Sequence, residues 1–108
     1  MEHFERGVVI VLTGELDAFN APALRKTFEE ALAATPEVVV LDLAAVAFLD
    51  STVLGAIVGL LRRQREAGGE LRVVLPDTTA RRIFEITGLD AALDVSPSRA
   101  AAMRSGTG

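Results

Sequence analysis

The sequence predicts an α/β fold in which about four helices pack on a small mixed, mostly parallel sheet of four to five strands. Three observations support this class. Short β-branched runs such as Val8–Leu12 alternate with longer segments of helical periodicity, and such alternation favours parallel strands joined by helical crossovers. Half of the 108 residues are hydrophobic. Only 5% are aromatic, so the core must consist of Val, Leu, Ile and Ala.

The length fits one domain over residues 1–108, and a chain of this size buries roughly two-thirds of its unfolded surface. We expect the packed part over about residues 4–103 and a frayed tail over 104–108. The acidic start, MEHFERGVV, is not typical of a signal peptide. Apolar runs also fall short of the ~18 residues that a membrane span needs. We therefore expect a cytoplasmic protein without membrane insertion.

The first half of the chain predicts two strands and a helix. Val8–Leu12 reads as a strand closed by Gly14, with Phe4 and Glu5 as a short strand before it and Gly7 at the turn. A helix follows, with Asn20 as N-cap and Pro22 in its first turn. Its expected apolar face consists of Leu24, Phe28, Ala31 and Leu32.

The middle of the chain predicts a buried strand and a long helix. Val38–Leu43 is apolar on both faces apart from Asp42, which is typical of a strand covered on both sides. We expect the chain to leave this strand through residues 44–49 and to form a helix from about Ser51 to Ala67. Gly68 and Gly69 then stop the helix.

The last third predicts two further strands, each followed by a helix. ELRVVLP reads as a third buried strand, and Asp77 can cap a short helix whose core face is Ala80, Ile83 and Phe84. Gly88 suits the C′ position of that helix. ALDV predicts a last short strand. Ser96 and Pro97 are expected as N-cap and N1 of a final helix carrying Ala100 and Met103.

The composition excludes several classes of function. The chain has no cysteine, which excludes thiolate metal sites. Its one histidine, His3, disfavours histidine zinc sites and serine–histidine hydrolysis. We expect no metal, no cofactor and no enzymatic activity. The net charge of −4 and the absence of Trp and Tyr also disfavour binding to nucleic acid.

The most polar triplet, Asp50, Ser51 and Thr52, stands between the two most apolar segments of the chain. It follows a central parallel strand and opens a helix, and ligands or partners meet open α/β sheets at that edge. One interpretation is structural, because all three residue types are good N-caps. A phosphate-binding loop would need glycines and a lysine, and a nucleophilic serine would need a base. A phosphoacceptor needs only an exposed hydroxyl, which Ser51 offers, and the helix N-terminus stabilises the added charge.

Two apolar rows run along the helix behind Ser51. The first is the expected core stripe: Leu54, Ile57, Val58 and Leu61. The second consists of Val53, Ala56 and Leu60. Either neighbouring helices cover this second row, or it is a docking row for a partner beside Ser51.

Four stretches resemble one family in order and spacing: LTGELD (12–17), VVLDLAAVAFLDSTVLG (39–55), GGELRVV (68–74) and RRIFEITGLD (81–90). They resemble the anti-sigma factor antagonists of the STAS domain superfamily, and the resemblance covers about residues 8–102. It implies a small mixed sheet with helices packed on it. It also implies a partner-switching regulator that binds an anti-sigma factor and thereby frees a sigma factor for transcription.

The resemblance assigns roles to single residues. The anti-sigma factor would be a serine kinase that phosphorylates Ser51 and so ends the complex, and a PP2C-type phosphatase would reverse the modification. Asp50 would shape the site, and Asp17 would lie at the partner interface. The family commonly has glycine where this chain has Val53, which places β-branched bulk near Ser51. Together the expected partner surface is Asp17, Asp50, Ser51, Thr52, Val53, Ala56 and Leu60.

A second hypothesis keeps the docking face but not the switch. The chain would then be a STAS subunit of a lipid-transport ATPase or of a stressosome-like scaffold, without phosphate chemistry. The sequence also leaves open whether Thr52 accepts phosphate when Ser51 is absent.

Overall fold

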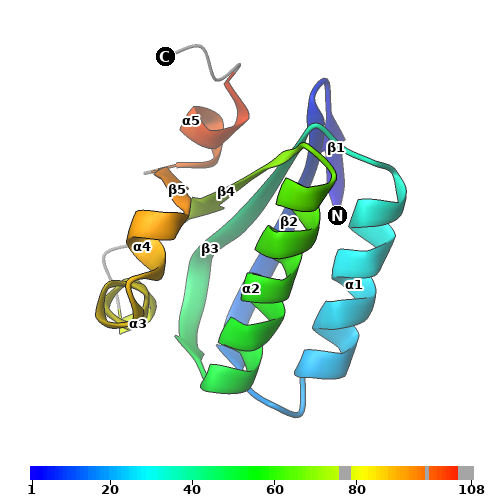
Figure 1. The fold of residues 1–108 in the computed structure, drawn as a ribbon. Coiled ribbons are helices and arrows are strands. Elements are labelled where there is room, and N and C mark those ends of the chain that lie inside the picture. Colours follow the sequence, from blue (N-terminus) through cyan, green and yellow to red (C-terminus); the bar gives the residue numbers. More distant parts are fainter. Residues whose placement is uncertain (76–78, 97, 105–108) are drawn as a thin grey trace.

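A computed structural model describes residues 1–75, 79–96 and 98–104 of the protein. Within these residues the chain forms a five-stranded mixed sheet and five helices, which confirms the predicted α/β class (Figure 1). In chain order the elements are β1 Glu2–Phe4, β2 Gly7–Leu16, α1 Ala21–Ala33, β3 Val38–Leu49, α2 Ser51–Glu66, β4 Glu70–Val74, α3 Thr79–Thr87, α4 Leu89–Ala92, β5 Asp94–Ser96 and α5 Arg99–Met103.

The strands lie in the sheet in the order β1-β2-β3-β4-β5. β1 pairs with β2 in antiparallel fashion through a tight turn, whereas β2, β3, β4 and β5 run parallel to one another. Parallel neighbours require crossover connections, and α1 and α2 supply two of them. The carboxyl ends of β2 and β3 therefore meet at the edge where α1 and α2 begin, at the lower end of the molecule in Figure 1.

Both faces of the sheet carry buried side chains, because alternate residues of each strand point to opposite sides. Helices α1 and α2 lie side by side over one face (Figure 1), and the larger core lies beneath them. There Ile10 of β2, Leu41 of β3 and Val73 of β4 pack with Phe84 of α3. The smaller core on the opposite face includes Ala102 of α5. The expectation that Val38–Leu43 is buried on both sides is confirmed.

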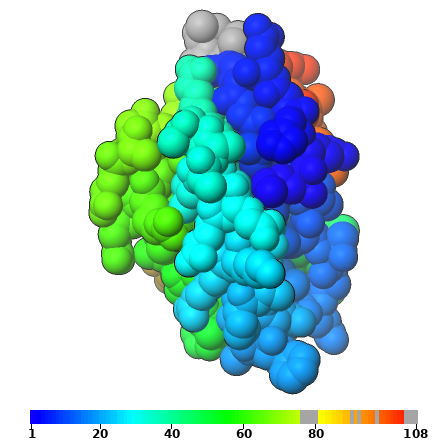
Figure 2. Space-filling view, turned by 90° about the vertical axis from the view of Figure 1, so that its right-hand side faces the viewer, coloured from blue at the N-terminus to red at the C-terminus, as the bar shows by residue number. Residues whose placement is uncertain are grey.

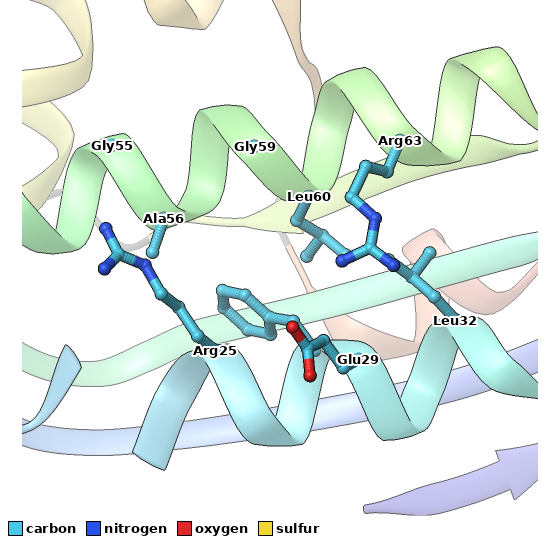
Figure 3. A pocket seen from close by; sticks show the side chains of 9 residues that line it. Arg25, Glu29, Leu32, Gly55, Ala56, Gly59, Leu60 and Arg63 are labelled. Atoms are coloured by element: carbon cyan, nitrogen blue, oxygen red, sulfur yellow. The ribbon is translucent and has the colours of Figure 1, made fainter. Parts of the chain in front are cut away.

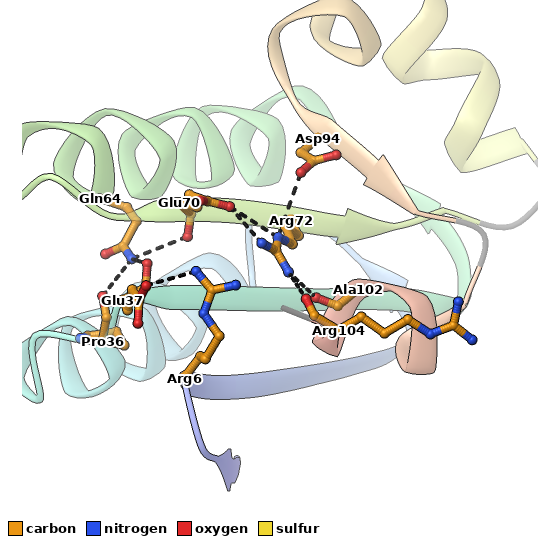
Figure 4. Close-up of polar contacts among 9 residues, drawn as sticks. All are labelled: Arg6, Pro36, Glu37, Gln64, Glu70, Arg72, Asp94, Ala102 and Arg104. Carbon is orange, nitrogen blue, oxygen red and sulfur yellow. Dashed lines mark hydrogen bonds and ion pairs between the residues drawn. The ribbon is translucent and has the colours of Figure 1, made fainter. Parts of the chain in front are cut away.

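The buried side chain of Arg72 binds the C-terminal segment, which packs on the face of the sheet that carries the smaller core. The guanidinium of Arg72 donates to the Glu70 carboxylate at 2.9 Å and to the backbone carbonyls of Ala102 at 2.8 Å and Arg104 at 2.7 Å (Figure 4). Asp94 lies 3.7 Å away. Because a buried charge must be paired and hydrogen-bonded, this set of acceptors makes the position of Arg72 tenable.

Two further contacts tie the amino ends of the strands together. The buried Gln64 of α2 donates to the carbonyls of Pro36 and Glu70, so it links the segment before β3 to the start of β4 (Figure 4). Arg6, in the β1–β2 turn, hydrogen-bonds to Glu37 at 2.8 Å. This hydrogen bond holds the pKa of the Glu37 carboxyl below its ordinary value. The contacts lie at the opposite end of the sheet from Ser51.

The strands of the first half are longer than expected. β2 continues past Gly14 to Leu16, and residues 44–49, expected as a loop, extend β3 to Leu49. Register shifts interrupt the pairing of β2 with β3 between Val11 and Thr13 and again between Gly14 and Glu15. The chain therefore turns directly from the end of β3 into α2, through Asp50 alone.

The C-terminal part needs three corrections. The four-residue helix α4 was not expected. Ser96 ends β5, and the N-cap of α5 is Ser98, whose hydroxyl accepts from the amide of Ala101 at 3.2 Å. Ala100 is exposed and Ala102 is the buried residue of this helix. Gly88 has the left-handed backbone that its predicted C′ position requires (φ 75°).

Other C-terminal predictions lie outside what the structure describes: the cap Asp77, Pro97 as N1 of the last helix, the side chain of Ala80 and the tail over residues 105–108.

Candidate functional site

The sheet register brings Asp17 and Asp50 together. Leu16, the last residue of β2, is the register partner of Leu49, the last residue of β3. Asp17 and Asp50 are the next residues of their segments, and the amide of Asp50 donates to the carbonyl of Leu16 at 3.1 Å. The two acidic residues therefore leave the sheet as neighbours, at the edge that the sequence predicted.

Asp50 holds two segments with one carboxylate. As the N-cap of α2 it accepts through Oδ1 from the amide of Val53 at 3.0 Å. Through Oδ2 it accepts from the amide of Ala18, in the β2–α1 loop, at 2.9 Å. The first bond satisfies a helix amide that has no partner within the helix. The second ties the β2–α1 loop to the residue next to Ser51.

Asp17 and Asn20 build the β2–α1 loop. The Asp17 carboxylate accepts from the amide of Phe19 at 3.0 Å, and its carbonyl accepts from the amide of Asn20 at 3.0 Å. Asn20 takes the predicted N-cap position of α1, but its side chain does not cap the helix. Its Oδ1 accepts instead from the amide of Asp17 at 3.1 Å. The side chain of Asp17 thus accepts from an amide later in the loop, and the side chain of Asn20 accepts from an amide earlier in it.

Ser51 and Thr52 are the first two residues of α2, and both are exposed. Backbone amides at a helix N-terminus attract anions, because they lack intrahelical acceptors and the helix dipole is positive there. Position and exposure together make the Ser51 hydroxyl reachable by another protein. They also allow it to carry a phosphate without loss of core packing.

The second apolar row of α2 is not an exposed docking row. Val53, Ala56 and Leu60 are all buried, with Val53 at 0% exposure. They belong to the same core cluster as Phe28 of α1. The expected contribution of these three side chains to an exposed partner surface is therefore wrong, since all three are buried in the core.

What remains open over this row is a small groove. It holds about 150 Å³ between α1 and α2, with Ala56 and Leu60 in its wall (Figure 3). The charged side chains of Arg25, Glu29 and Arg63 line it as well (Figure 3). Gly55 and Gly59 contribute the helix surface where larger side chains would have closed it.

Sequence reasoning missed one residue of this edge, Phe19. Its side chain is 92% exposed in the loop that Asp50 holds. The available signal was an aromatic residue in a turn that begins with Asp17 and ends with Asn20, DAFN. Among the described residues, no group of three or more His, Asp or Glu side chains is arranged to hold a metal ion.

Comparison with known proteins agrees with this architecture. Residues 1–102 match the family model of the STAS domain. The chain belongs to the STAS domain family. This STAS domain is 33% identical over 92 residues to an anti-sigma-B factor antagonist of Bacillus subtilis, a match that covers 85% of this chain and 84% of the relative.

Two solved structures share the fold of this STAS domain. An anti-sigma factor antagonist from Mycobacterium paratuberculosis superposes with a TM-score of 0.87 at 30% identity, over 94% of this chain and 86% of the other. The Bacillus cell fate determinant SpoIIAA in its phosphorylated form superposes with a TM-score of 0.72 at 25% identity, over 93% and 92% of the two chains. Within the described part of this STAS domain, no helix has the length and apolar character of a membrane span.

Proposed function

We propose that this STAS domain is an anti-sigma factor antagonist that is switched off by phosphorylation of Ser51. Unmodified, it binds an anti-sigma factor that is also a serine kinase, and the sigma factor is released. The observation that carries this proposal is the exposed hydroxyl of Ser51 at the start of α2, next to a loop that Asp50 holds in place. The partner surface is formed by Asp17, Asp50, Ser51 and Thr52.

The relatives and the packing of Val53 support this proposal. Curated relatives are named as antagonists of anti-sigma factors, and a related fold has been solved in a phosphorylated form. The chain departs from the common family pattern at Val53. Because that side chain is fully buried, its bulk fills the core and does not stand in front of Ser51. The departure therefore leaves the approach of a kinase open.

The switch is a balanced phosphoryl transfer. The Oγ of Ser51 forms a bond to the γ-phosphorus of ATP bound by the kinase, the bond to the leaving ADP breaks, and the hydroxyl proton passes to a base of the kinase. A phosphoserine carries about −1.5 to −2 charge. The N-terminus of α2 tolerates it, while Asp17 and Asp50 increase the negative charge of the surface. The partner is displaced and the fold persists.

In this proposal the chain is a binding protein and a kinase substrate rather than an enzyme. A PP2C-type phosphatase restores the hydroxyl by hydrolysing the phosphoserine with water. The protein works in the cytoplasm, where sigma factors act with RNA polymerase. A STAS subunit of a transporter ATPase or of a scaffold would use the same face without phosphorylation. Whether Ser51 is phosphorylated therefore distinguishes the antagonist from such a subunit.

The test combines a kinase assay with a binding assay. Purified chain is incubated with ATP and the kinase-type anti-sigma factors of the same organism, and the phosphate is mapped by mass spectrometry. We expect one phosphate on Ser51, none on Ser51→Ala, and an unchanged rate for the control Thr35→Ala, an exposed threonine between α1 and β3. Phosphate that persists in Ser51→Ala contradicts the assignment.

The charge switch is tested by a second pair of variants. Ser51→Asp places a carboxylate at the first position of α2, and we expect it to weaken binding to the anti-sigma factor at least tenfold. Ser51→Ala removes the hydroxyl without adding charge and should bind nearly as tightly as the unmodified chain. Equal affinities of the two variants, measured by calorimetry, would exclude a switch by charge.

A further inference from the structure

Phe19 is the most exposed large hydrophobic side chain in the described part of the chain. It is 92% exposed, whereas the next, Ile86 on α3, is 77% exposed. Isolated apolar residues on a surface are common and need no explanation by themselves. Phe19 differs because of the loop that carries it and because of what lies beside that loop.

The backbone on both sides of Phe19 is fixed by hydrogen bonds. The amide before it, that of Ala18, donates to Asp50 at 2.9 Å, and its own amide donates to Asp17 at 3.0 Å. The following amide, that of Asn20, donates to the Asp17 carbonyl at 3.0 Å. A mobile loop would lose entropy when a partner ordered it, but a loop built in this way does not. The aromatic ring is therefore presented from a rigid base.

Phe19 and Ser51 lie on neighbouring segments at the same edge of the sheet. Asp50 is the peptide neighbour of Ser51, and its carboxylate accepts from the residue that precedes Phe19. In the space-filling view the segment around residue 20 forms the lower tip of the molecule (Figure 2). A protein whose active site reaches Ser51 therefore works at the edge of the sheet that carries this tip.

We propose that Phe19 is the hydrophobic anchor by which this STAS domain binds its anti-sigma factor. The ring enters an apolar pocket that lies beside the kinase site of that protein. The inference rests on the function proposed above and adds a residue to it. Aromatic side chains on rigid bases are the usual source of binding free energy in protein interfaces, and Ser51 itself offers little apolar area.

Two other occupants fit the surface less well. A second copy of the chain would need an interface of about 1,200 Å² or more, which one protruding side chain does not provide. An anionic membrane would be repelled by the neighbouring exposed carboxylates of Glu15 and Asp17. Both are outcomes of the test.

The affinity of the anti-sigma factor for four forms of the full chain tests the anchor. Calorimetry compares the unmodified chain, Phe19→Ala, Phe19→Leu and the control Ile86→Ala, an exposed apolar residue on α3. We expect Phe19→Ala to raise Kd about 30-fold, Phe19→Leu to raise it less, and Ile86→Ala to change it less than twofold. Since Phe19 is exposed, the unfolding midpoint of Phe19→Ala should equal that of the unmodified chain.

The outcomes separate this inference from the proposed function. If the unmodified chain binds and is phosphorylated on Ser51, but Phe19→Ala binds equally tightly, only the anchor is overturned. If no kinase-type anti-sigma factor binds or modifies the unmodified chain, the proposed function is overturned and the anchor with it. Self-association or binding to vesicles of anionic phospholipid that is lost in Phe19→Ala, without loss of anti-sigma factor binding, reassigns the residue and overturns the anchor.

Discussion

Val53 shows how two neighbouring residues of a helix can serve different purposes. It lies two positions after Ser51, yet Ser51 is exposed and Val53 is fully buried, because each residue of an α-helix is rotated by about 100° from the one before. The first turn of α2 therefore presents its hydroxyls outward and its valine to the core. Replacing the glycine that the family commonly has adds core volume without altering the exposed surface.

Restoring that glycine should cost stability and leave recognition intact. Val53→Gly removes a buried side chain and adds the entropic cost of glycine in a helix, so we expect the free energy of unfolding to fall by about 3 kcal/mol. The control Thr52→Gly changes an exposed residue of the same turn and should cost about 1 kcal/mol or less. Urea denaturation measures both. Equal losses for the two variants would mean that Val53 contributes no packing.

The sequence predicted the position of the site better than the directions of its side chains. Asp50, Ser51 and Thr52 could be placed because a polar triplet between a buried strand and a helix has few other locations. The burial of Val53, Ala56 and Leu60 could not be decided, because periodicity shows two apolar rows but not which neighbour covers each. The exposure of Phe19 depends on how its loop folds, and the only sign of it in the sequence is an aromatic residue within the turn DAFN.

The start of α2 depends on both carboxylate oxygens of Asp50. One oxygen caps the helix through Val53 and the other holds the β2–α1 loop through Ala18. Asparagine keeps one acceptor oxygen and presents a donor where the second oxygen was. The two roles of Asp50 can therefore be separated by substitution.

We expect Asp50→Asn to keep the helix cap and release the loop, and Asp50→Ala to lose both. The loss in the free energy of unfolding should be about 1 kcal/mol for Asp50→Asn and about 2 kcal/mol for Asp50→Ala. Amide hydrogen exchange followed by NMR gives the direct readout. The amide of Ala18 should lose protection in both variants, and that of Val53 only in Asp50→Ala. Continued protection of Ala18 in Asp50→Asn would show that Asp50 does not hold the loop.

Elements with strong periodicity were predictable, and their ends were not. The helix from Ser51 and the strand from Val38 appear as expected. The strand continues through residues 44–49 because pairing with β2 persists there despite register shifts, and small residues such as Ala44 and Ala47 carry no strand signal. The four residues of α4 are too few for a helical pattern. Ser96 and Ser98 both precede a helix, and only tertiary pairing with β4 assigns Ser96 to a strand.

The two faces of the sheet are closed in different ways. Helices α1 and α2 cover one face along most of its length (Figure 1), whereas the other face is covered in part by the five-residue helix α5. A helix that short is not stable on its own. Its place depends on Ala102 in the core, on Arg99, whose Nε donates to the buried Asp42 at 3.0 Å, and on Arg72, whose guanidinium binds the last carbonyls of the described chain.

Arg72 is therefore expected to stabilise the fold by keeping the C-terminal segment packed on the sheet. Arg72→Met keeps the buried volume but leaves the carbonyls of Ala102 and Arg104 without their charged donor, so the free energy of unfolding should fall by about 3 kcal/mol. The control Arg82→Met removes an exposed arginine of α3 and should change it by less than about 0.5 kcal/mol.

Hydrogen exchange shows where that loss falls. In Arg72→Met the amides of α5, such as Ala102, should exchange by local opening, faster than those of the central strand β3. Arg72→Lys keeps the charge but not the forked geometry that reaches both carbonyls. The protection of the α5 amides in Arg72→Lys should therefore lie between that of the unmodified chain and that of Arg72→Met. If α5 and β3 lose protection together in Arg72→Met, the arginine stabilises the sheet itself, and the C-terminal helix is fastened by its apolar contacts and by the Arg99–Asp42 pair.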